Sequence, residues 1–264
     1  MATYLDKILD AHRSEARGDQ RSTDALMERV ADIPPTRGFR AALLGGDTLG
    51  VISEVKRRSP SKGDLLPGLD PAALARVYRD AGANCLSVLT DREYFGGSPE
   101  DLAAARGAVE IPVLRKDFTV SANDVCDARL MGADCVLLIV AALDDNELRD
   151  FSQLAREVGL DVLVEIHDEA ELERAMASTE GDLIGVNQRD LLTFEVDQER
   201  AVRVAGSMEP RTVKVAESGV RGRDDANALA GAGYSAVLVG EHLVTAAVPG
   251  AALADLRVPL PSVD

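Results

Sequence analysis

The chain has 264 residues, 46% hydrophobic and 28% charged, which is enough apolar material for one large core in a soluble protein. Its 45 acidic residues outnumber its 29 lysines and arginines, which argues against nucleic acid as a partner, because phosphate backbones bind to basic surfaces. No apolar run approaches the roughly 20 residues that cross a bilayer and the charged N-terminus does not resemble a signal peptide, so we expect a cytoplasmic protein without a membrane partner.

The first 47 residues predict a helical extension. Apolar side chains at positions 4, 5, 8 and 9 form one stripe of an amphipathic helix, and a second helical stretch follows Ser22. A turn at Ile33-Pro34-Pro35 then separates these helices from the rest of the chain. A segment this short buries too little to fold alone. We therefore expect residues 1–264 to form a single domain in which residues 1–47 cap the remainder.

From there on, a glycine followed by an apolar strand recurs along the chain. It is found at Gly82, Gly132, Gly159 and Gly233, at intervals close to multiples of about 25 residues, the size of a short βα unit. The strands lack strict alternation, as expected for parallel strands buried on both faces. The predicted strands are 49–55, 84–90, 112–116, 134–140, 161–166, 182–187, 211–216 and 235–240.

Helices are expected between these strands, with N-terminal capping residues at Asp70, Ser121 and Asp144. Alternation of this kind fits either an open doubly wound sheet or a closed barrel. Eight units of such regularity favour the barrel, so the predicted fold is α/β, a (β/α)8 TIM barrel with an N-terminal helical extension.

Charged and polar residues stand at the carboxyl ends of several predicted strands, where barrels of this kind place their active sites. Any one of them alone could be a solvated charge at the start of a loop. Together they indicate a shared cavity, because charges inside apolar strands need partners. Lys214 is a weaker candidate, since it lies within its strand. The strand-end set is Glu54, Lys56, Lys116, Glu165, Asn187, Arg189, Glu217 and Ser218.

Two glycines indicate an anion site. Gly219 and Gly240 follow the last two strands, where backbone N–H groups of such barrels often bind phosphate. Ser59 and the basic run 56–62 could close over the same anion, although glycine in a βα loop is also common turn chemistry. Phe95 and Phe118 follow strands two and three, and they either pack in the core or offer apolar faces to a substrate ring.

These segments together resemble the indole-3-glycerol-phosphate synthase family of tryptophan biosynthesis. The resemblance covers nearly the whole chain, including the N-terminal extension, and runs in the family's order through SEVKRRSPSKG, SVLTDREYFGGS, VLRKDF, VLLIVAAL, VLVEIHDE, IGVNQRDL, VAESGV and VLVGEHL. It implies a carboxy-lyase that needs no cofactor. The implied reaction converts 1-(2-carboxyphenylamino)-1-deoxyribulose 5-phosphate, a sugar phosphate bearing an anthranilate ring, to indole-3-glycerol phosphate, CO2 and water.

The resemblance also implies roles for individual residues. Lys116 is the implied general acid toward the carbonyl oxygen, and Glu165 acts in the proton transfers around dehydration, with Lys56 and Glu54 as charged partners. The other implied residues of the catalytic pocket are Asn187, Glu217 and Ser218. The implied phosphate contacts are Ser59, Gly219, Gly240 and the backbone N–H of Glu241, and the implied pocket walls are Arg189, Phe95, Phe118, Leu137 and Leu238.

Two alternatives stay open. A phosphate-binding barrel such as phosphoribosylanthranilate isomerase would share the anion site, but it would lack the lysine and glutamate set on strands one, three and five. A scaffold that only binds a sugar phosphate would not need Lys116 and Glu165, which are both present. The sequence therefore favours an active enzyme, which we expect to be a monomer or a weak homo-oligomer.

The rare residue types add three further expectations. The cysteines, Cys85, Cys126 and Cys135, are predicted to be small buried side chains. The histidines, His12, His167 and His242, are too far apart in sequence to suggest a local metal motif, so no metal is expected. Only five basic residues are lysines, and together with the acidic excess this suggests a surface adapted to high salt in a halophilic organism.

Overall fold

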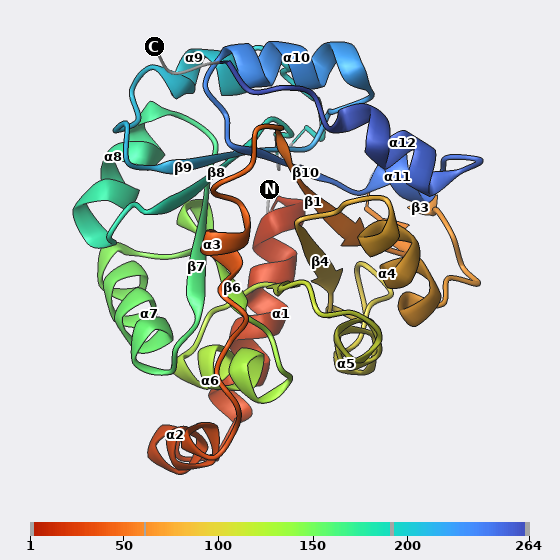
Figure 1. Cartoon of the computed structure of the whole chain (residues 1–264). Helices are drawn as coiled ribbons and strands as arrows, with labels where there is room; N and C mark the ends of the chain where they lie inside the picture. The colour runs from red at the N-terminus through yellow and green to blue at the C-terminus, as the bar shows by residue number, and fades with distance from the viewer. Residues whose placement is uncertain (1–2, 61, 191–192, 262–264) are drawn as a thin grey trace.

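A computed structural model describes residues 3–60, 62–190 and 193–261, and its centre is a closed barrel of parallel strands (Figure 1). The predicted barrel and its eight strands are confirmed. The largest difference in position is at 211, where the backbone N–H of Thr212 still donates to the carbonyl of Glu209 in a turn, so the strand starts at Val213. The barrel strands are β1 (Gly50–Val55), β4 (Cys85–Leu89), β5 (Val113–Lys116), β6 (Cys135–Ile139), β7 (Asp161–Ile166), β8 (Leu183–Asn187), β9 (Val213–Glu217) and β10 (Ala236–Val239).

The barrel closes where its first and last strands meet. β1 pairs in parallel with β10, from Gly50 opposite Ala236 onward, and on its other edge with β4. Every residue of β1, β4, β6, β8 and β10 is buried, which explains why these segments lack a polar alternation. A short antiparallel pair, β2 (Arg58–Ser59) and β3 (Gly63–Asp64), lies in the loop after β1.

Helices surround the barrel and begin at the predicted capping residues. Asp70 accepts hydrogen bonds from two backbone N–H groups of its helix, and Asp144 forms a capping box with Glu147. Ser121 caps the helix that begins at Ala122, since its hydroxyl accepts the backbone N–H of Asp124. The helices that follow β1 are α4 (Pro71–Asp80), α5 (Pro99–Ala108), α6 (Ala122–Leu130), the 3-10 turn η1 (Val140–Ala142), α7 (Asp145–Glu157), α8 (Glu169–Ser178), α9 (Arg200–Ala205), α10 (Arg223–Gly231), α11 (Glu241–Val244) and α12 (Pro249–Leu256). Among the described residues, no helix has the length and apolar character needed to span a bilayer.

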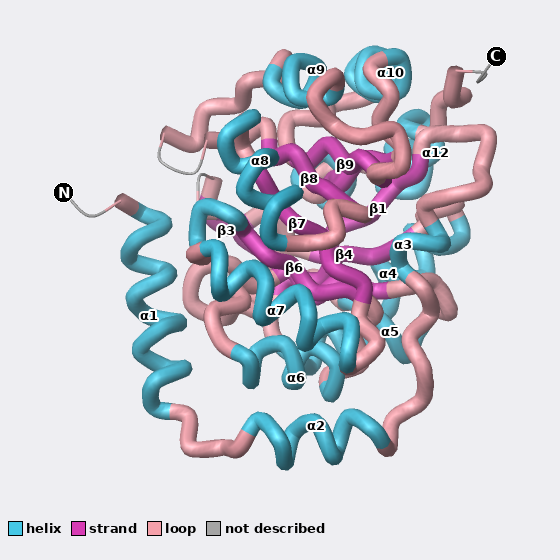
Figure 2. The backbone as a smooth tube through the Cα atoms, turned by 90° about the vertical axis from the view of Figure 1, so that its left-hand side faces the viewer, coloured by secondary structure: helices cyan, strands magenta, loops and turns pink. Residues whose placement is uncertain are grey.

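The N-terminal extension wraps around the barrel from one end to the other. Its helix α1 (Tyr4–Gly18) stands at one end, α2 (Thr23–Ala31) runs beside α6, and α3 (Phe39–Ala42) lies at the opposite end (Figure 2). Arg13 fixes α1 by a two-pronged ion pair with Glu147, at 2.7 and 2.9 Å.

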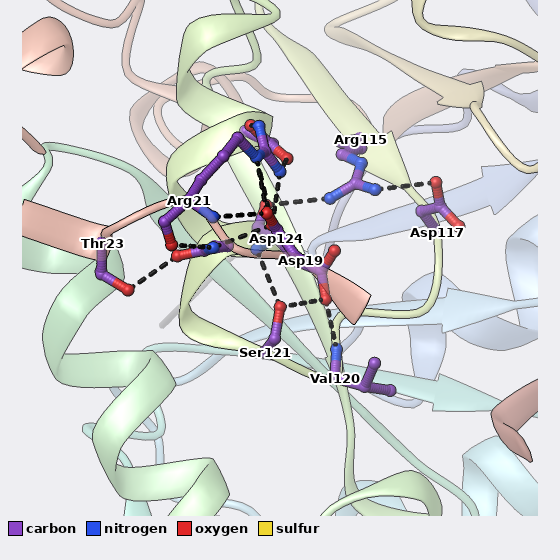
Figure 3. A network of polar contacts seen from close by, with 10 residues as sticks. Asp19, Arg21, Thr23, Arg115, Asp117, Val120, Ser121 and Asp124 are labelled. Carbon is purple, nitrogen blue, oxygen red and sulfur yellow. Dashed lines mark hydrogen bonds and ion pairs between the residues drawn. The ribbon is translucent and has the colours of Figure 1, made fainter. Parts of the chain in front are cut away.

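The linker between α1 and α2 is tied to the start of α6. The guanidinium of Arg21 donates to both carboxylate oxygens of Asp127, at 2.9 and 2.7 Å. It also donates to Asp19, which is labelled with Arg21 in Figure 3. The hydroxyl of Thr23 donates to Asn123 at 2.7 Å. The extension is therefore held by specific polar contacts as well as by its apolar stripe.

Asp134 anchors the end of the barrel where α3 lies. Its fully buried carboxylate forms an ion pair with Arg106 and accepts the backbone N–H groups of Arg37 and Val113, both at 2.8 Å. One carboxylate thus joins the extension, α5 and the start of β5.

Replacement of Asp134 by asparagine should lower the free energy of unfolding by about 3 kcal/mol, because Arg106 would lose its buried counter-ion. Urea unfolding followed by circular dichroism measures the change. The matched control is Glu110→Gln, since this side chain is 97% exposed and lies 3.8 Å from Arg37. The control should change the stability by less than about 0.5 kcal/mol. Equal unfolding midpoints for the two variants would contradict the anchoring role of Asp134.

Candidate active site

The strand-end residues predicted from the sequence meet in one cavity of about 570 Å³ at the carboxyl end of the barrel. All sixteen candidate residues line it. Its floor is formed by side chains from the strand ends, and its rim by the loops that follow them. The sixteen are Glu54, Lys56, Ser59, Phe95, Lys116, Phe118, Leu137, Glu165, Asn187, Arg189, Glu217, Ser218, Gly219, Leu238, Gly240 and Glu241.

A buried cluster of charges occupies the floor. The ammonium of Lys116 lies 2.7 Å from Oε2 of Glu165 and 3.4 Å from Oε2 of Glu217. The second oxygen of Glu165 accepts a hydrogen bond from Nδ2 of Asn187 at 3.0 Å. A separate pair, Lys56 and Glu54, is in contact at 2.5 Å. Each charge inside the barrel therefore has the partner that its burial requires.

The pKa values of the two carboxyl groups beside Lys116 are shifted in opposite directions. Burial would raise the pKa of Glu165, but the charges of Lys116 and His167 and the bonds from Lys116 and Asn187 hold it well below its usual range. Burial raises the pKa of Glu217 to about 8, and the charges of Glu165 and Glu54 add to this effect although Lys116 opposes it. At neutral pH the site thus holds an ionised carboxylate and a carboxylic acid on either side of one ammonium.

Burial favours the neutral form of Lys116, but the negative charges of Glu165, Glu217 and Glu54 outweigh it and raise the pKa of the ammonium well above its usual range. Lys116 is therefore an ammonium at neutral pH, a group that can serve as a proton donor.

Two glycines give the floor carboxylates room. A Cβ atom at Gly240 would collide with Oε1 of Glu54, and a Cβ atom at Gly185 would collide with Oε1 of Glu217. Oε1 of Glu217 is buried and has no hydrogen-bond partner among the described residues. The absence of a side chain at positions 185 and 240 is what lets these carboxylates lie inside the barrel.

The loops after β9 and β10 shape the predicted anion site. Ser218 has φ +65°, a conformation that costs free energy for a residue with a side chain, and Gly219 follows with φ +75°. The side-chain amide of Gln188 supports this turn by donating to the carbonyl of Ser218 at 2.7 Å. Gly240 precedes α11, so that the backbone of Glu241 begins this helix beside the cavity.

The basic run after β1 faces the cavity only in part, which corrects the expectation that the whole run attracts the anion. Lys56 and Lys62 line the cavity, and Lys62 pairs with Glu241. Arg57 instead binds Asp101 and the carbonyl of Leu69, and Arg58 binds Asp64. Lys214 lies outside the cavity and donates to the carbonyl of Ala205 at 2.8 Å.

An aromatic wall stands beside the charged floor. The rings of Phe95 and Phe118 lie 6.3 Å apart. Oδ1 of Asp91 accepts the backbone N–H of Phe95 at 3.1 Å, and Oδ1 of Asp117 accepts that of Phe118 at 2.9 Å. These carboxylates hold the two loops that carry the wall.

Asp91 and Asp117 also follow strands and line the cavity, and sequence reasoning missed them although their positions after LT and RK were a usable signal. It also missed His12 of α1, whose Nε2 lies 3.0 Å from Oδ2 of Asp91 and 3.9 Å from Oδ1 of Asp117. Nothing in the sequence near His12 indicates this long-range contact.

His12, Asp91 and Asp117 are the group with metal-ligand spacing found among the described residues, with their ligand atoms within 4.8 Å of one another. Their carboxylates are already used by protein donors, since Oδ2 of Asp117 accepts from Thr90 and, at 3.0 Å, from Arg115 (Figure 3). Hydrogen bonding within the protein therefore accounts for this cluster.

All three cysteines are free and buried, as predicted.

Known proteins match this chain along most of its length. The family described as Indole-3-glycerol phosphate synthase matches residues 5–256. The chain is 49% identical to the indole-3-glycerol phosphate synthase of Arthrobacter sp. (strain FB24) over 259 residues, which cover 96% of this chain and 95% of that protein. It is 48% identical to the enzyme of the same name from Mycolicibacterium smegmatis (strain ATCC 700084 / mc(2)155) over 257 residues, covering 97% and 94%.

A solved structure, thiamine phosphate pyrophosphorylase from Pyrococcus furiosus, has a TM-score of 0.59 at 18% identity and covers 79% of this chain and 93% of that one, a likeness of fold alone. With the family match over residues 5–256 and relatives near half identity over almost the full length, the chain belongs to the indole-3-glycerol phosphate synthase family.

Proposed function

We propose that the sixteen cavity residues carry out the family reaction, the ring closure, decarboxylation and dehydration of 1-(2-carboxyphenylamino)-1-deoxyribulose 5-phosphate to indole-3-glycerol phosphate. The observation that carries this proposal is the contact of Lys116 with two carboxylates of opposite protonation, Glu165 and Glu217. Such a centre holds a proton donor and a proton acceptor in one shielded pocket, which is what this reaction needs.

In the proposed mechanism Lys116 donates its proton to the carbonyl oxygen as the ring carbon attacks the carbonyl carbon. The departing CO2 leaves its bonding electron pair in the ring, which restores aromaticity. The former carbonyl oxygen, now a hydroxyl, takes a second proton from the protonated carboxyl of Glu217 and leaves as water, while Glu165 accepts the proton from the adjacent carbon. Asn187 orients Glu165, and Lys56, steadied by Glu54, faces the substrate carboxylate.

The remaining candidates are assigned to binding. Gly219, Gly240, the backbone N–H of Glu241 and the hydroxyl of Ser59 are proposed to hold the phosphate, with Ser218 as a polar contact. The substrate ring would lie against the apolar wall formed by Phe95, Phe118, Leu137 and Leu238, with Arg189 at the cavity rim.

The purified protein should convert the carboxyphenylamino-deoxyribulose phosphate to indole-glycerol phosphate without added metal or nucleotide. The new indole ring gives a fluorescence signal that the chain itself does not obscure, since it contains no tryptophan. A silent assay in both dilute and molar salt would contradict the proposed function.

Replacement of Lys116 by methionine should reduce turnover by at least about 100-fold, because the proton donor is lost. Substrate binding should stay measurable by calorimetry, since the phosphate and ring contacts are unchanged. Lys214→Met is the matched control, as this lysine lies outside the cavity, and it should keep near-native turnover. Near-native turnover of the Lys116 variant would move the acid role to another residue.

We also propose that residues 1–264 act as a single domain, with 1–47 as its cap, in a cytoplasmic monomer or weak homo-oligomer that binds neither nucleic acid nor membranes. The contacts of Arg13 with Glu147 and of Arg37 with Asp134 support the capping role, because they tie the extension to both ends of the barrel. The acidic excess supports the exclusion of nucleic acid.

The same acidic excess, with only five lysines in the chain, supports a further proposal, that the protein comes from a salt-adapted organism. A net charge of -16 repels itself in dilute buffer, whereas the screening length falls to about 3 Å in molar salt. The thermal unfolding midpoint should therefore be higher in 1 M potassium chloride than in dilute buffer, measured by circular dichroism. An unchanged or lower midpoint would count against salt adaptation.

A further inference from the structure

His167 is a partly buried histidine at the edge of the proposed catalytic centre, and the mechanism above does not use it. It follows β7, two residues after Glu165, and its side chain is only 12% exposed. It is not among the residues that line the cavity. Its ring is therefore close to the reacting groups but out of reach of the substrate.

One ring nitrogen of His167 is firmly held. Nδ1 lies 3.0 Å from Oε2 of Glu171, and the same carboxylate oxygen accepts the backbone N–H of His167 at 2.8 Å. Glu171 stands at the third position of α8 and is itself bonded to the N-cap residue Asp168 at 2.8 Å. The start of α8 thus fixes the position and the tilt of the imidazole ring.

The other ring nitrogen points toward the catalytic carboxylate. Nε2 is buried, has no hydrogen-bond partner among the described residues, and lies 3.9 Å from Oε1 of Glu165. An unprotonated Nε2 would direct its lone pair at a negatively charged oxygen, which is unfavourable. A proton on Nε2 converts this contact into an attraction and makes the ring an imidazolium between two carboxylates.

The charges around the ring favour that state. Burial opposes protonation of His167, but the hydrogen bond to Glu171 and the charges of Glu165 and Glu171 outweigh it and raise the pKa of the imidazole. Arg200 is the cation that opposes this shift. Its effect is the smallest of these, so the pKa of the imidazole is still raised and the charged form is stabilised.

A second cation beside the carboxylate of Glu165 makes Lys116 a stronger acid. The negative charges of Glu165 and Glu54, joined by Glu217 when it is ionised, hold the proton on Lys116, and an acid that keeps its proton too firmly transfers it poorly near neutral pH. An imidazolium beside Oε1 partly neutralises the charge of Glu165, so the carboxylate attracts the Lys116 proton less strongly through Oε2. The same imidazolium remains beside Glu165 after Lys116 has given its proton away, when that carboxylate would otherwise be left without a counter-charge.

We propose that His167 is a positioning residue of the catalytic centre, whose imidazolium, held by Glu171, shares the carboxylate of Glu165 with Lys116 and thereby makes Lys116 a stronger acid. This rests on the proposed acid role of Lys116. His167 acts through Glu165 and does not touch the substrate, so its loss should affect the chemical step and not the binding of substrate.

The charge coupling can be measured without turnover. The chain has three histidines, so the ring signals in an NMR titration are few, and the signal lost in His167→Asn identifies the residue. In the unaltered protein the imidazole pKa should lie above the usual value of about 6.5. Glu165→Gln and Glu171→Gln should each lower it by about one unit, because each removes an adjacent negative charge. Glu169→Gln, at an exposed position of the same helix, should leave it unchanged.

The kinetic test uses His167→Asn, whose amide can still donate to Glu171 but carries no charge. We expect kcat near pH 7 to fall by about tenfold, the factor that corresponds to one pKa unit, while KM stays close to the native value. In the unaltered enzyme kcat should decline as pH rises through the pKa of His167, and this decline should be absent from the variant. Circular dichroism and the unfolding midpoint verify that the variant is folded.

The outcomes separate this inference from the proposed function. A His167 pKa that does not respond to Glu165→Gln overturns the inference, and so does a His167→Asn variant that is folded and has the native kcat profile. An unaltered protein without turnover refutes the proposed function, whereas the NMR titration still shows whether the two side chains are coupled.

Discussion

The structure of the site depends on one constraint, that charges inside a barrel must neutralise one another. Lys116 satisfies it by contact with Glu165 and Glu217. The positions of these side chains in turn restrict which residues can lie beside them. Position 185 must be glycine because a side chain there would occupy the space of Glu217, and Asn187 must offer its amide to the free oxygen of Glu165. The charged cluster is thus an electrostatic unit in which the protonation of each member depends on the others.

A second requirement is that the loops around this unit keep their shape. Asp91 and Asp117 hold the backbone of the loops that carry Phe95 and Phe118, and His12 reaches them from the N-terminal extension. The extension therefore supports the wall of the cavity as well as covering the barrel. The charged floor and the apolar wall are built by different parts of the chain, and together they give one cavity the two surfaces that the proposed substrate requires.

The barrel and most of its site could be predicted because both depend on local sequence. Apolar runs at a regular spacing locate the strands, and a strand's carboxyl end then locates Lys116 or Glu165 within a residue. Contacts that depend on distant segments could not be predicted. His12 lies 79 residues from Asp91, and Arg57 turns away from the cavity because its partner Asp101 lies on α5. The pKa shifts of Glu165 and Glu217 have opposite directions, and this difference likewise depends on three-dimensional surroundings that the sequence does not display.

The wrapping of the extension also has a consequence in time. Its anchors lie far along the chain: Arg37 binds Asp134, and the backbone N–H of Arg40 donates to Asp161 at 2.9 Å. During synthesis the extension leaves the ribosome before those later strands, and its docking surface is incomplete until they exist. The backbone N–H of Leu49, where the extension joins β1, donates to the carbonyl of Val258, which is made later still. The extension is therefore made well before the residues that hold it, and the newborn chain carries an amphipathic helix that cannot yet dock.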